Sequence, residues 1–394
     1  MVLEIVSVGV TVVAAGLLLM TLYLLGLTVA AALGGRAARP GEASAQRRFA
    51  ILVPAHNEAA LIGRLVDNLN QLVYPRDLYE ICVVADNCDD RTAPIARSLG
   101  ALVFERFSES ERAKGFALRW LLMKLHASGR VFDAYVVIDA DSVVSRNFLH
   151  AMNARLAAGS QVIQAHYSVL NASASSLAGL RGAALAAVHY LRPLGRLVLG
   201  LSCGLKGNGM CFAARIIDEF GWDWYTLAED VEFHLALVRQ GIRVDFAPEA
   251  NVQADMPVTL RQAASQNDRW ERGRLQLVRT HVVGLVFDGL RVRSALRLDA
   301  AIEQLIPPLS VPFAVGFVCF VVGLALGSVV CLALAAAAVV GQMVYLLAAL
   351  ALVGAPRSAY LSLGAAPVYI AWKFGLYAQA LLNARSTAWV RTAR

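Results

Sequence analysis

The chain has 394 residues, of which 58% are hydrophobic and only 16% charged, too apolar for an ordinary soluble protein, so part of it should lie in a membrane. The 36 Lys and Arg residues exceed the 29 acidic residues, and the formal net charge of +7 suits an anionic lipid surface or a phosphate-bearing substrate. No basic arm with interleaved aromatic residues is present, so nucleic acid is not an expected partner.

An uncharged run over residues 8–33 is long enough to cross a hydrocarbon core of about 30 Å. It lacks the basic start of a signal peptide, so it predicts a transmembrane helix within residues 1–34. Glu4 is the only side-chain charge before the run. Four arginines follow it, namely Arg36, Arg39, Arg47 and Arg48. The positive-inside rule therefore predicts an integral protein of the inner or plasma membrane, with the domain after the linker at 35–48 in the cytoplasm.

From residue 49 onwards, short apolar runs alternate with amphipathic helices. The runs at 49–53, 81–85, 101–104 and 136–138 have the length and composition of buried strands. Because strands and helices alternate with short connections, the sequence predicts an α/β domain with a doubly wound, mostly parallel sheet over residues 49–280.

Two carboxylates, Asp139 and Asp141, end the most apolar of these strands. Acids one residue apart at the carboxyl end of a strand can bind one divalent cation, although a solvated turn has the same pattern. The first strand ends in Pro54, Ala55, His56, Asn57 and Glu58, and the second ends in Asp86 and Asn87. Three strand ends with carboxylates or amides at one sheet edge indicate a nucleotide site, although no Gly-x-Gly-x-x-Gly or Walker-type loop is present.

Three later segments each allow two interpretations. Residues 171–200 are apolar but contain three arginines, and either lie on the membrane surface or form a packed helix pair. Glu229 and Asp230 precede a helix, where an acid either enters a site or caps the helix. Gln266, Arg269 and Trp270 share one helical face, where they either bind a diphosphate and a sugar ring or form ordinary surface.

The last third of the chain is predicted to consist of interfacial helices at 281–308 and of membrane and interfacial helices at 309–394. The apolar run at 311–353 is too long for one helix, and Gly327 and Ser328 mark the turn between two spans. Pro367 and Lys373 interrupt the run at 359–382. That run is expected to be interfacial or re-entrant, which gives three spans, while four spans stay open.

Taken in order, the acids Asp86, Asp139-x-Asp141 and Glu229-Asp230 and the motif Gln266-x-x-Arg269-Trp270 resemble the membrane-integrated family-2 glycosyltransferases. This branch includes cellulose, chitin and hyaluronan synthases and also lipid-directed enzymes. The resemblance covers about residues 49–280 and implies a GT-A catalytic fold. Ala228 stands where the family has Thr before its acid pair, and Asn208-Gly209-Met210 falls where the family has its acceptor-site loop.

By this resemblance, a set of strand-end and helix residues would hold the uridine and diphosphate of a UDP-sugar, namely Pro54, Ala55, His56, Glu58, Asp86 and Lys114. Asp139 would contact the ribose and, with Asp141, bind Mg²⁺ or Mn²⁺. Asp230 would be the catalytic base, with Gln266, Arg269 and Trp270 shaping the catalytic site.

The implied reaction is a direct displacement, which inverts the anomeric carbon and joins the sugar to a membrane-associated acceptor. That acceptor is expected to be a growing β-linked polysaccharide or oligosaccharide, with transfer of a single sugar to a membrane lipid as the alternative. A transporter or membrane scaffold is disfavoured because all the acids are present and the chain has no internal repeat. No feature of the sequence indicates an oligomeric state or the identity of the sugar.

Overall fold

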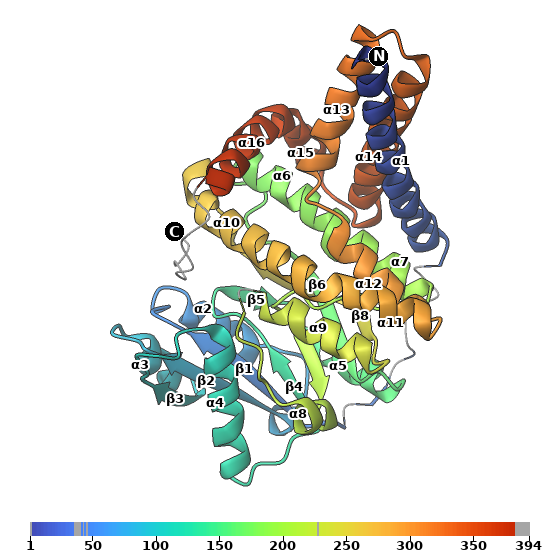
Figure 1. Ribbon diagram of the computed structural model, residues 1–394. Helices are drawn as coiled ribbons and strands as arrows, with labels where there is room; N and C mark the ends of the chain where they lie inside the picture. The colour runs from blue at the N-terminus through green and yellow to red at the C-terminus, as the bar shows by residue number, and fades with distance from the viewer. Residues whose placement is uncertain (1, 35–40, 42, 45, 227, 383–394) are drawn as a thin grey trace.

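The computed structural model describes residues 2–34, 41, 43–44, 46–226 and 228–382, without the side chains of 261, 265, 268, 269 and 375–382. Much of the predicted linker at 35–48 therefore lies outside the described residues. Figure 1 shows an α/β domain, a layer of helices next to it, and a bundle of apolar helices that extends away from both.

One eight-stranded mixed sheet, in the order β3-β2-β1-β4-β7-β6-β8-β5, forms the centre of the α/β domain. Its strands are β1 (Phe49–Ala55), β2 (Tyr79–Asp86), β3 (Leu102–Arg106), β4 (Ala134–Val137), β5 (Ser142–Val144), β6 (Val162–Val169), β7 (Met210–Ala213) and β8 (Val244–Ala254). The half made of β3, β2, β1 and β4 is parallel, as is the pair β6 and β8. Strand β7 runs antiparallel to β4 and β6, and β5 runs antiparallel to β8. The predicted α/β class and mostly parallel sheet are confirmed.

Strand β1 shows why the parallel half is buried on both faces. Phe49, Ile51 and Val53 pack into one apolar core, whereas Ala50 and Leu52 pack into the other. This alternation follows from the two-residue period of a strand. Helices cover the two faces, namely α2 (Ile62–Asn70), α3 (Thr92–Ser98), α4 (Lys114–Ala127), α5 (Phe148–Ala157), α8 (Ala214–Phe220) and α9 (Glu229–Arg239), with a short 3₁₀ turn, η1 (Arg76–Leu78).

The apolar bundle consists of α1 (Val2–Gly34), α13 (Ser310–Ala325) and α14 (Val329–Leu352). By length and composition, α1 and α14 are able to cross a membrane, and the pair of α12 (Ala295–Leu305) and α13, bent by 69°, would add a third span if taken together. The predicted break at Gly327 and Ser328 is present, with Gly327 at φ 63°. A Cβ at Gly341 would lie 2.6 Å from Thr21 Cγ2, so a small residue lets α14 approach α1.

The predicted interruptions near the carboxyl end are also present. Helix α15 (Arg357–Ser362), a 3₁₀ turn (Leu363–Ala365) and α16 (Ala366–Leu382) run across the other helices and do not continue the bundle (Figure 1). Lys373 of α16 is buried and lies 3.2 Å from Glu271 Oε1. The lysine that breaks the apolar run therefore has its charge compensated within the protein, and the membrane placement of α16 stays a prediction.

Residues 171–200 form a continuous rod that lies between the sheet and the bundle. It contains α6 (Ser176–Leu185), a π-helical segment η2 (Ala186–Leu191) and α7 (Arg192–Val198). The rod contacts β6 and β8 on one side and α1 and α14 on the other. Next to it lie α10 (Leu260–Leu277), a π-helical segment η3 (Val278–Val282) and α11 (Val283–Arg291). The segment is thus packed between two protein layers, but as one continuous rod and not as the predicted helix pair.

A buried polar network fastens this rod to the bundle. Arg196 donates to Asp299 Oδ2 at 2.8 Å and to Glu303 Oε2 at 2.6 Å, both on α12. Tyr23 of α1 donates to Asp299 Oδ1 at 2.5 Å, and Arg192 donates to Tyr345 of α14 at 2.8 Å. Four helices from distant parts of the chain, α1, α7, α12 and α14, are therefore joined by buried or partly buried hydrogen bonds.

Replacing Arg196 by Met should destabilise the protein strongly, because Asp299 and Glu303 would lose a cation that is 1% exposed. Breaking one partner of a buried ion pair costs about 3–5 kcal/mol. The matched control is Arg97→Met, whose pair with Glu105 is 53% and 46% exposed and is worth roughly 0–1 kcal/mol. Thermal unfolding in detergent measures both variants, and equal losses in the two would contradict this assignment.

Candidate active site

A first cavity of about 1250 Å³ opens at the carboxyl ends of β1, β2 and β4. Its walls contain Pro54, Ala55, His56, Glu58, Asp86, Lys114, Asp139, Asp141 and Gln266. Every residue that the resemblance assigns to the donor or the metal therefore lies in one cavity. The reason is topological, because parallel strands bring their carboxyl ends to the same edge of a sheet.

The loops after β1 and β2 are held together around this cavity. His56 Nδ1 lies 2.7 Å from the carbonyl oxygen of Asp86, and Asn57 Oδ1 accepts a hydrogen bond from the Asp89 amide at 2.9 Å. Asn57 and Asn87 adopt φ values of 54° and 51°, a left-handed conformation that asparagine tolerates better than most residues. The two asparagines let the chain turn sharply at the strand ends.

Asp86 lines the cavity, and one of its carboxylate oxygens is hydrogen-bonded to an arginine. Its Oδ1 accepts a hydrogen bond from Arg106 Nη1 at 2.7 Å, and the Arg106 side chain is 4% exposed. The buried guanidinium holds the carboxylate in place and compensates its charge. Asp86 can therefore offer its remaining acceptor positions to a neutral ligand group, such as a base or a ribose hydroxyl.

The turn with Asp139 and Asp141 is fixed by the loop that carries Asn208. Asn208 Oδ1 accepts from the Asp139 amide at 3.1 Å, and Asn208 Nδ2 donates to Ser142 Oγ at 2.8 Å. From the other side, Arg64 donates to the carbonyl oxygen of Asp141 at 2.8 Å. The predicted acceptor-site loop thus also positions the acids of the first cavity.

The two acids fit a divalent cation that arrives together with a diphosphate. Among the described residues, no group of three or more His, Cys, Asp or Glu side chains is arranged to hold a metal by itself. Mg²⁺ typically uses one or two carboxylates and takes its other ligands from substrate phosphates and water. Asp139 and Asp141 match that donor set.

Lys114, the first residue of α4, connects the first cavity to a second one. Its Nζ lies 2.5 Å from Asp139 Oδ1 and 2.5 Å from the carbonyl oxygen of Gly207. Burial would lower the pKa of Lys114, but Asp139 and Glu229 outweigh burial and raise it. The lysine is therefore a permanent cation between the acids of the two cavities.

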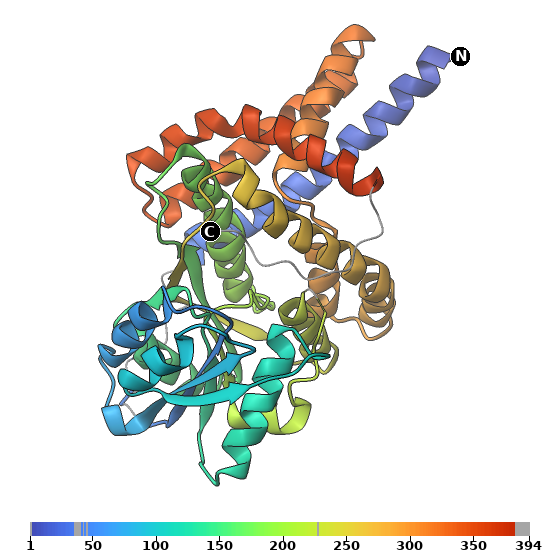
Figure 2. The ribbon, with the colours of Figure 1, turned by 90° about the vertical axis from the view of Figure 1, so that its left-hand side faces the viewer.

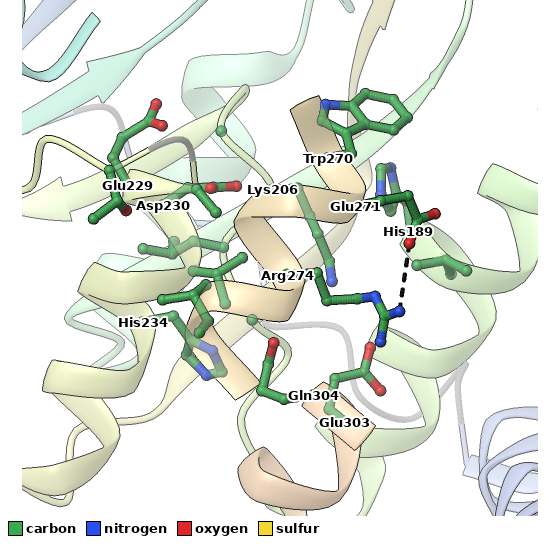
Figure 3. Close-up of a pocket in the computed structure, with 18 of the residues that line it drawn as sticks. His189, Lys206, Glu229, Asp230, His234, Trp270, Glu271, Arg274, Glu303 and Gln304 are labelled. Carbon is green, nitrogen blue, oxygen red and sulfur yellow. Dashed lines mark hydrogen bonds and ion pairs between the residues drawn. The ribbon is translucent and has the colours of Figure 1, made fainter. Parts of the chain in front are cut away.

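The second cavity, of about 940 Å³, is bordered by Lys114 and Tyr167, which also line the first. Glu229 and Asp230 from the first turn of α9 lie on one side, and Trp270, Glu271 and Arg274 of α10 lie on another (Figure 3). Its far wall is formed by α12 and by residues 306–309, where the apolar bundle begins. The second cavity thus extends from the acids to the membrane-type helices.

Glu229 and Asp230 are both half-buried. Burial raises the pKa of Glu229 to about 7, and the neighbouring Asp230 adds to this shift. Burial also raises the pKa of Asp230, while Lys114 opposes the shift. Figure 3 shows the two side chains pointing in different directions. Gly207, at φ 75°, lets the Asp230 carboxylate approach, since a Cβ there would lie 3.3 Å from Asp230 Oδ2.

The motif on α10 lies where the two cavities meet. Gln266 lines the first cavity and Trp270, which is 39% exposed, lines the second. The side chain of Arg269 lies outside the described residues, so its predicted role stays a prediction. Arg181 of α6 donates to Gln266 Oε1, and its guanidinium lies 5.7 Å from the centre of the Trp270 ring. Arg181 therefore contacts two residues of the motif. In the sequence, it is only one of three arginines that interrupt an apolar run.

Three residues of the site were not predicted from the sequence, namely Tyr167, Arg181 and Lys206. Tyr167 follows His166 in β6, a strand with no continuous apolar run. Lys206 belongs to the glycine-rich segment at 204–209, which overlaps the predicted acceptor-site loop Asn208-Gly209-Met210. A lysine inside such a loop was the one available signal for a charged ligand.

The α/β sheet domain thus carries two joined cavities, one at the strand ends and one beside helices that are long and apolar enough to span a membrane. The family model described as "Glycosyltransferase like family 2" matches residues 46–273. The chain belongs to this family.

Among similar proteins is the "Probable glycosyltransferase YdaM" of Bacillus subtilis, 25% identical over 240 residues, or 59% of this chain and 56% of that protein. A beta-monoglucosyldiacylglycerol synthase of Synechocystis is 28% identical over 233 residues, or 57% of this chain and 47% of that protein. The chain thus spans about half the length of these curated relatives. A mannosyltransferase from Pyrobaculum calidifontis, solved with GDP-Man and Mn²⁺, has a TM-score of 0.46 at 19% identity, over 85% of this chain and 98% of that one.

Replacing Glu229 by Gln should stabilise the protein more at pH 8 than at pH 5. The folded-state pKa of about 7 exceeds the ordinary value of 4.5, so the folded chain binds more protons than the unfolded chain between these values. The stability contributed by protonated Glu229 is fully present below pH 4.5 and is lost as the pH rises through 7. Gln cannot ionise and avoids that loss. Thermal unfolding at both pH values tests this against exposed Glu219→Gln, and equal pH responses of the two variants would contradict it.

Proposed function

We propose that the protein is an inverting glycosyltransferase that moves a sugar from a UDP-sugar to a hydroxyl group of a membrane-associated acceptor. The observation that carries this proposal is the junction of the two cavities at Lys114. A donor in the first cavity would present its sugar to Asp230 in the second. Membership of the family supports the same class of reaction.

The first cavity would bind the donor. Residues 54–58 and Asp86 would surround the uridine, and Lys114 would neutralise part of the diphosphate charge. Asp139 would contact the ribose and, with Asp141, hold Mg²⁺ or Mn²⁺; when bound, such a cation stabilises the charge that develops on the leaving diphosphate. Arg269, one turn after Gln266 on α10, would add a guanidinium to the same group.

The second cavity would bind the acceptor, with Asp230 as the base. A buried carboxylate with a raised pKa is a better proton acceptor than an exposed one, and such a base contributes about 10²- to 10⁴-fold to the rate. The acceptor oxygen would attack the anomeric carbon opposite the diphosphate, so an α-linked donor would give a β-glycoside. Trp270 would provide a stacking surface for a sugar ring.

The catalytic domain is proposed to face the cytoplasm, with α1, α14 and the α12–α13 pair in the inner or plasma membrane. The arginines that follow the first apolar run support this orientation. Helix α11 exposes Val283, Phe287 and Leu290 to 78%, 66% and 64%, which suits a helix at the membrane interface.

The acceptor is proposed to be either a growing β-linked polymer or a membrane lipid, and one observation favours the lipid. The far wall of the second cavity contains Ile306, Pro307, Pro308 and Leu309, directly before α13. A lipid could place its headgroup beside Asp230 and keep its chains along this apolar wall. The Synechocystis relative is named for synthesis of a glycolipid, which agrees with this preference.

Asp230→Asn keeps the size of the side chain and removes the proton acceptor. The transfer rate should fall by at least ~100-fold, while UDP affinity changes little. UDP release from a panel of UDP-sugars and UDP binding by calorimetry measure the two effects separately. The comparison variant is Glu229→Gln, which should retain most of the rate. If instead Glu229→Gln loses the transfer rate and Asp230→Asn retains most of it, Glu229 is the base.

The metal assignment predicts a change in binding as well as in activity. Mn²⁺ should strengthen UDP binding by the full-length protein, and EDTA should reverse this effect. Asp141→Asn should lose most of the Mn²⁺-dependent gain, because a neutral amide is a weaker ligand for a hard cation. Exposed Glu219→Asn is the control. An undiminished Mn²⁺ effect in Asp141→Asn would contradict the assignment.

A further inference from the structure

The second cavity contains more positive than negative side chains away from the catalytic acids. Residues 109–116 contribute Glu109, Arg112 and Lys114 to the lining. Outside that segment, the lining cations are Arg181, Arg192, Arg196, Lys206, Arg274 and Lys373, and the carboxylates other than Glu229 and Asp230 are Asp299, Glu271 and Glu303. Because a buried charge is costly without a partner, each cation raises the question of what compensates it.

Four of these cations have carboxylate partners. Arg192 and Arg196 lie 3.4 and 2.6 Å from Glu303, and Arg196 also lies 2.8 Å from Asp299. On the α10 side, the cations share one acid: Arg274 lies 3.4 Å and Lys373 lies 3.2 Å from Glu271 (Figure 3).

Arg181 has no such partner among the described residues. It is 4% exposed, and its neighbours are neutral, namely the Gln266 oxygen, the Trp270 ring and the Met256 sulfur. Its Nη1 is buried and makes no hydrogen bond within the described part of the chain. The lining residue His189 also has a buried ring nitrogen, Nδ1, without a described partner. The second cavity is thus lined by two buried nitrogen atoms, Arg181 Nη1 and His189 Nδ1, that have no hydrogen-bond partner among the described residues.

Lys206 is the second cation without a partner, since no described carboxylate lies within ion-pair distance of its Nζ. Figure 3 shows it extending between the catalytic acids and Arg274. Burial lowers the pKa of Lys206, while Glu303 and Asp230 oppose this shift from a distance. The neighbouring Gly207 lies against Asp230, so the loop that carries the lysine also contacts the proposed base.

We propose that the acceptor is an anionic lipid whose phosphate group binds to Arg181 and Lys206 while its hydroxyl group faces Asp230. Arg181, which is buried, and Lys206, which is half-buried, have no described carboxylate partner and provide charge-assisted hydrogen bonds for a phosphate. The apolar wall at 306–309 accommodates the lipid chains. The assignment of the hydroxyl group rests on the proposed function, whereas the binding of the phosphate does not.

The transfer step balances with this acceptor. The acceptor hydroxyl loses its proton to Asp230 and forms a bond to the anomeric carbon. The bond from that carbon to the diphosphate oxygen breaks, and UDP leaves with the electron pair. The lipid phosphate keeps its charge throughout, so it positions the acceptor and takes no part in the displacement.

Binding is tested without any donor, using the full chain in detergent. The probes are dihexanoyl phosphatidylglycerol and neutral dihexanoylglycerol, which have the same acyl chains. The wild type should bind the anionic lipid at least ~10-fold more tightly, as one charge-assisted hydrogen bond allows. Arg181→Gln and Lys206→Gln should each remove most of this preference, and Lys206→Arg should keep it. Surface Lys124→Gln, with the same change in charge, should have no effect.

Two further measurements keep the inference testable. Lys206→Gln should melt at a higher temperature than the wild type, because it removes a half-buried charge that has no described carboxylate partner. A lower melting temperature assigns Lys206 a structural role and overturns the proposal. Inorganic phosphate should displace the anionic lipid only weakly. If phosphate binds as tightly as the lipid, the site serves a soluble phosphate ester and the lipid assignment is overturned.

The outcomes also separate this inference from the proposed function. Equal binding of the two lipids, together with UDP release from a UDP-sugar, would overturn the anionic acceptor and leave the glycosyltransferase proposal intact. Selective binding of the anionic lipid without use of any UDP-sugar would support the phosphate site and overturn the proposed function.

Discussion

The ammonium group of Lys114 is the contact on which the candidate site depends. It lies between Asp139 in the first cavity and the carbonyl oxygen of Gly207 beside the second, at 2.5 Å from each. Without this cation, the acids of both cavities would repel one another with no positive charge between them. Lys114 therefore allows the acids of the two cavities to lie next to each other, as the proposed displacement between two bound substrates requires.

A second constraint sets the shape of the acceptor side. The network of Tyr23, Arg196, Asp299 and Glu303 fixes α12 against α1 and α7, so the wall of the second cavity is part of the same rigid layer that meets the apolar bundle. Buried ion pairs contribute little net stability but fix geometry when all their groups are satisfied. The distance between the acids proposed for catalysis and the membrane-type helices is thus determined by buried polar contacts and not by a flexible connection.

The sequence was sufficient to predict the elements whose signal is local. Strands β1, β2 and β4 are apolar runs that end in polar residues, and the acids at their ends were predicted correctly to share one sheet edge. Strand β6 was missed because Gln164 and His166 interrupt it, and its pairing with β8 shifts register at that point. A broken apolar pattern and a bulge leave no two-residue period to detect.

The contacts of Arg181 could not be predicted for a different reason. Arg181 reaches Gln266 across 85 positions of sequence, and only the folded rod of α6 places it behind the α10 motif. In the sequence, Arg181 is one arginine in an apolar segment. That pattern is equally typical of a residue at the membrane surface. Its burial without a carboxylate is a property of the fold alone.

The burial of the Arg181 charge without a described carboxylate partner has a physical consequence for how the enzyme would work. Arg181 donates to Gln266 at the edge of the first cavity and also lines the second cavity, so an anion bound to it would change the electric field at both proposed substrate sites. A cavity that retains uncompensated cations is less stable when empty than one lined by neutral residues, and proteins commonly accept such a cost at binding sites. Binding of an anionic acceptor would relieve the repulsion between Arg181, Lys206 and their cationic neighbours. The free energy gained when this repulsion is relieved would favour the arrangement in which donor, acceptor and base are held together. An anionic acceptor would therefore be preferred over a neutral one because its binding stabilises the site.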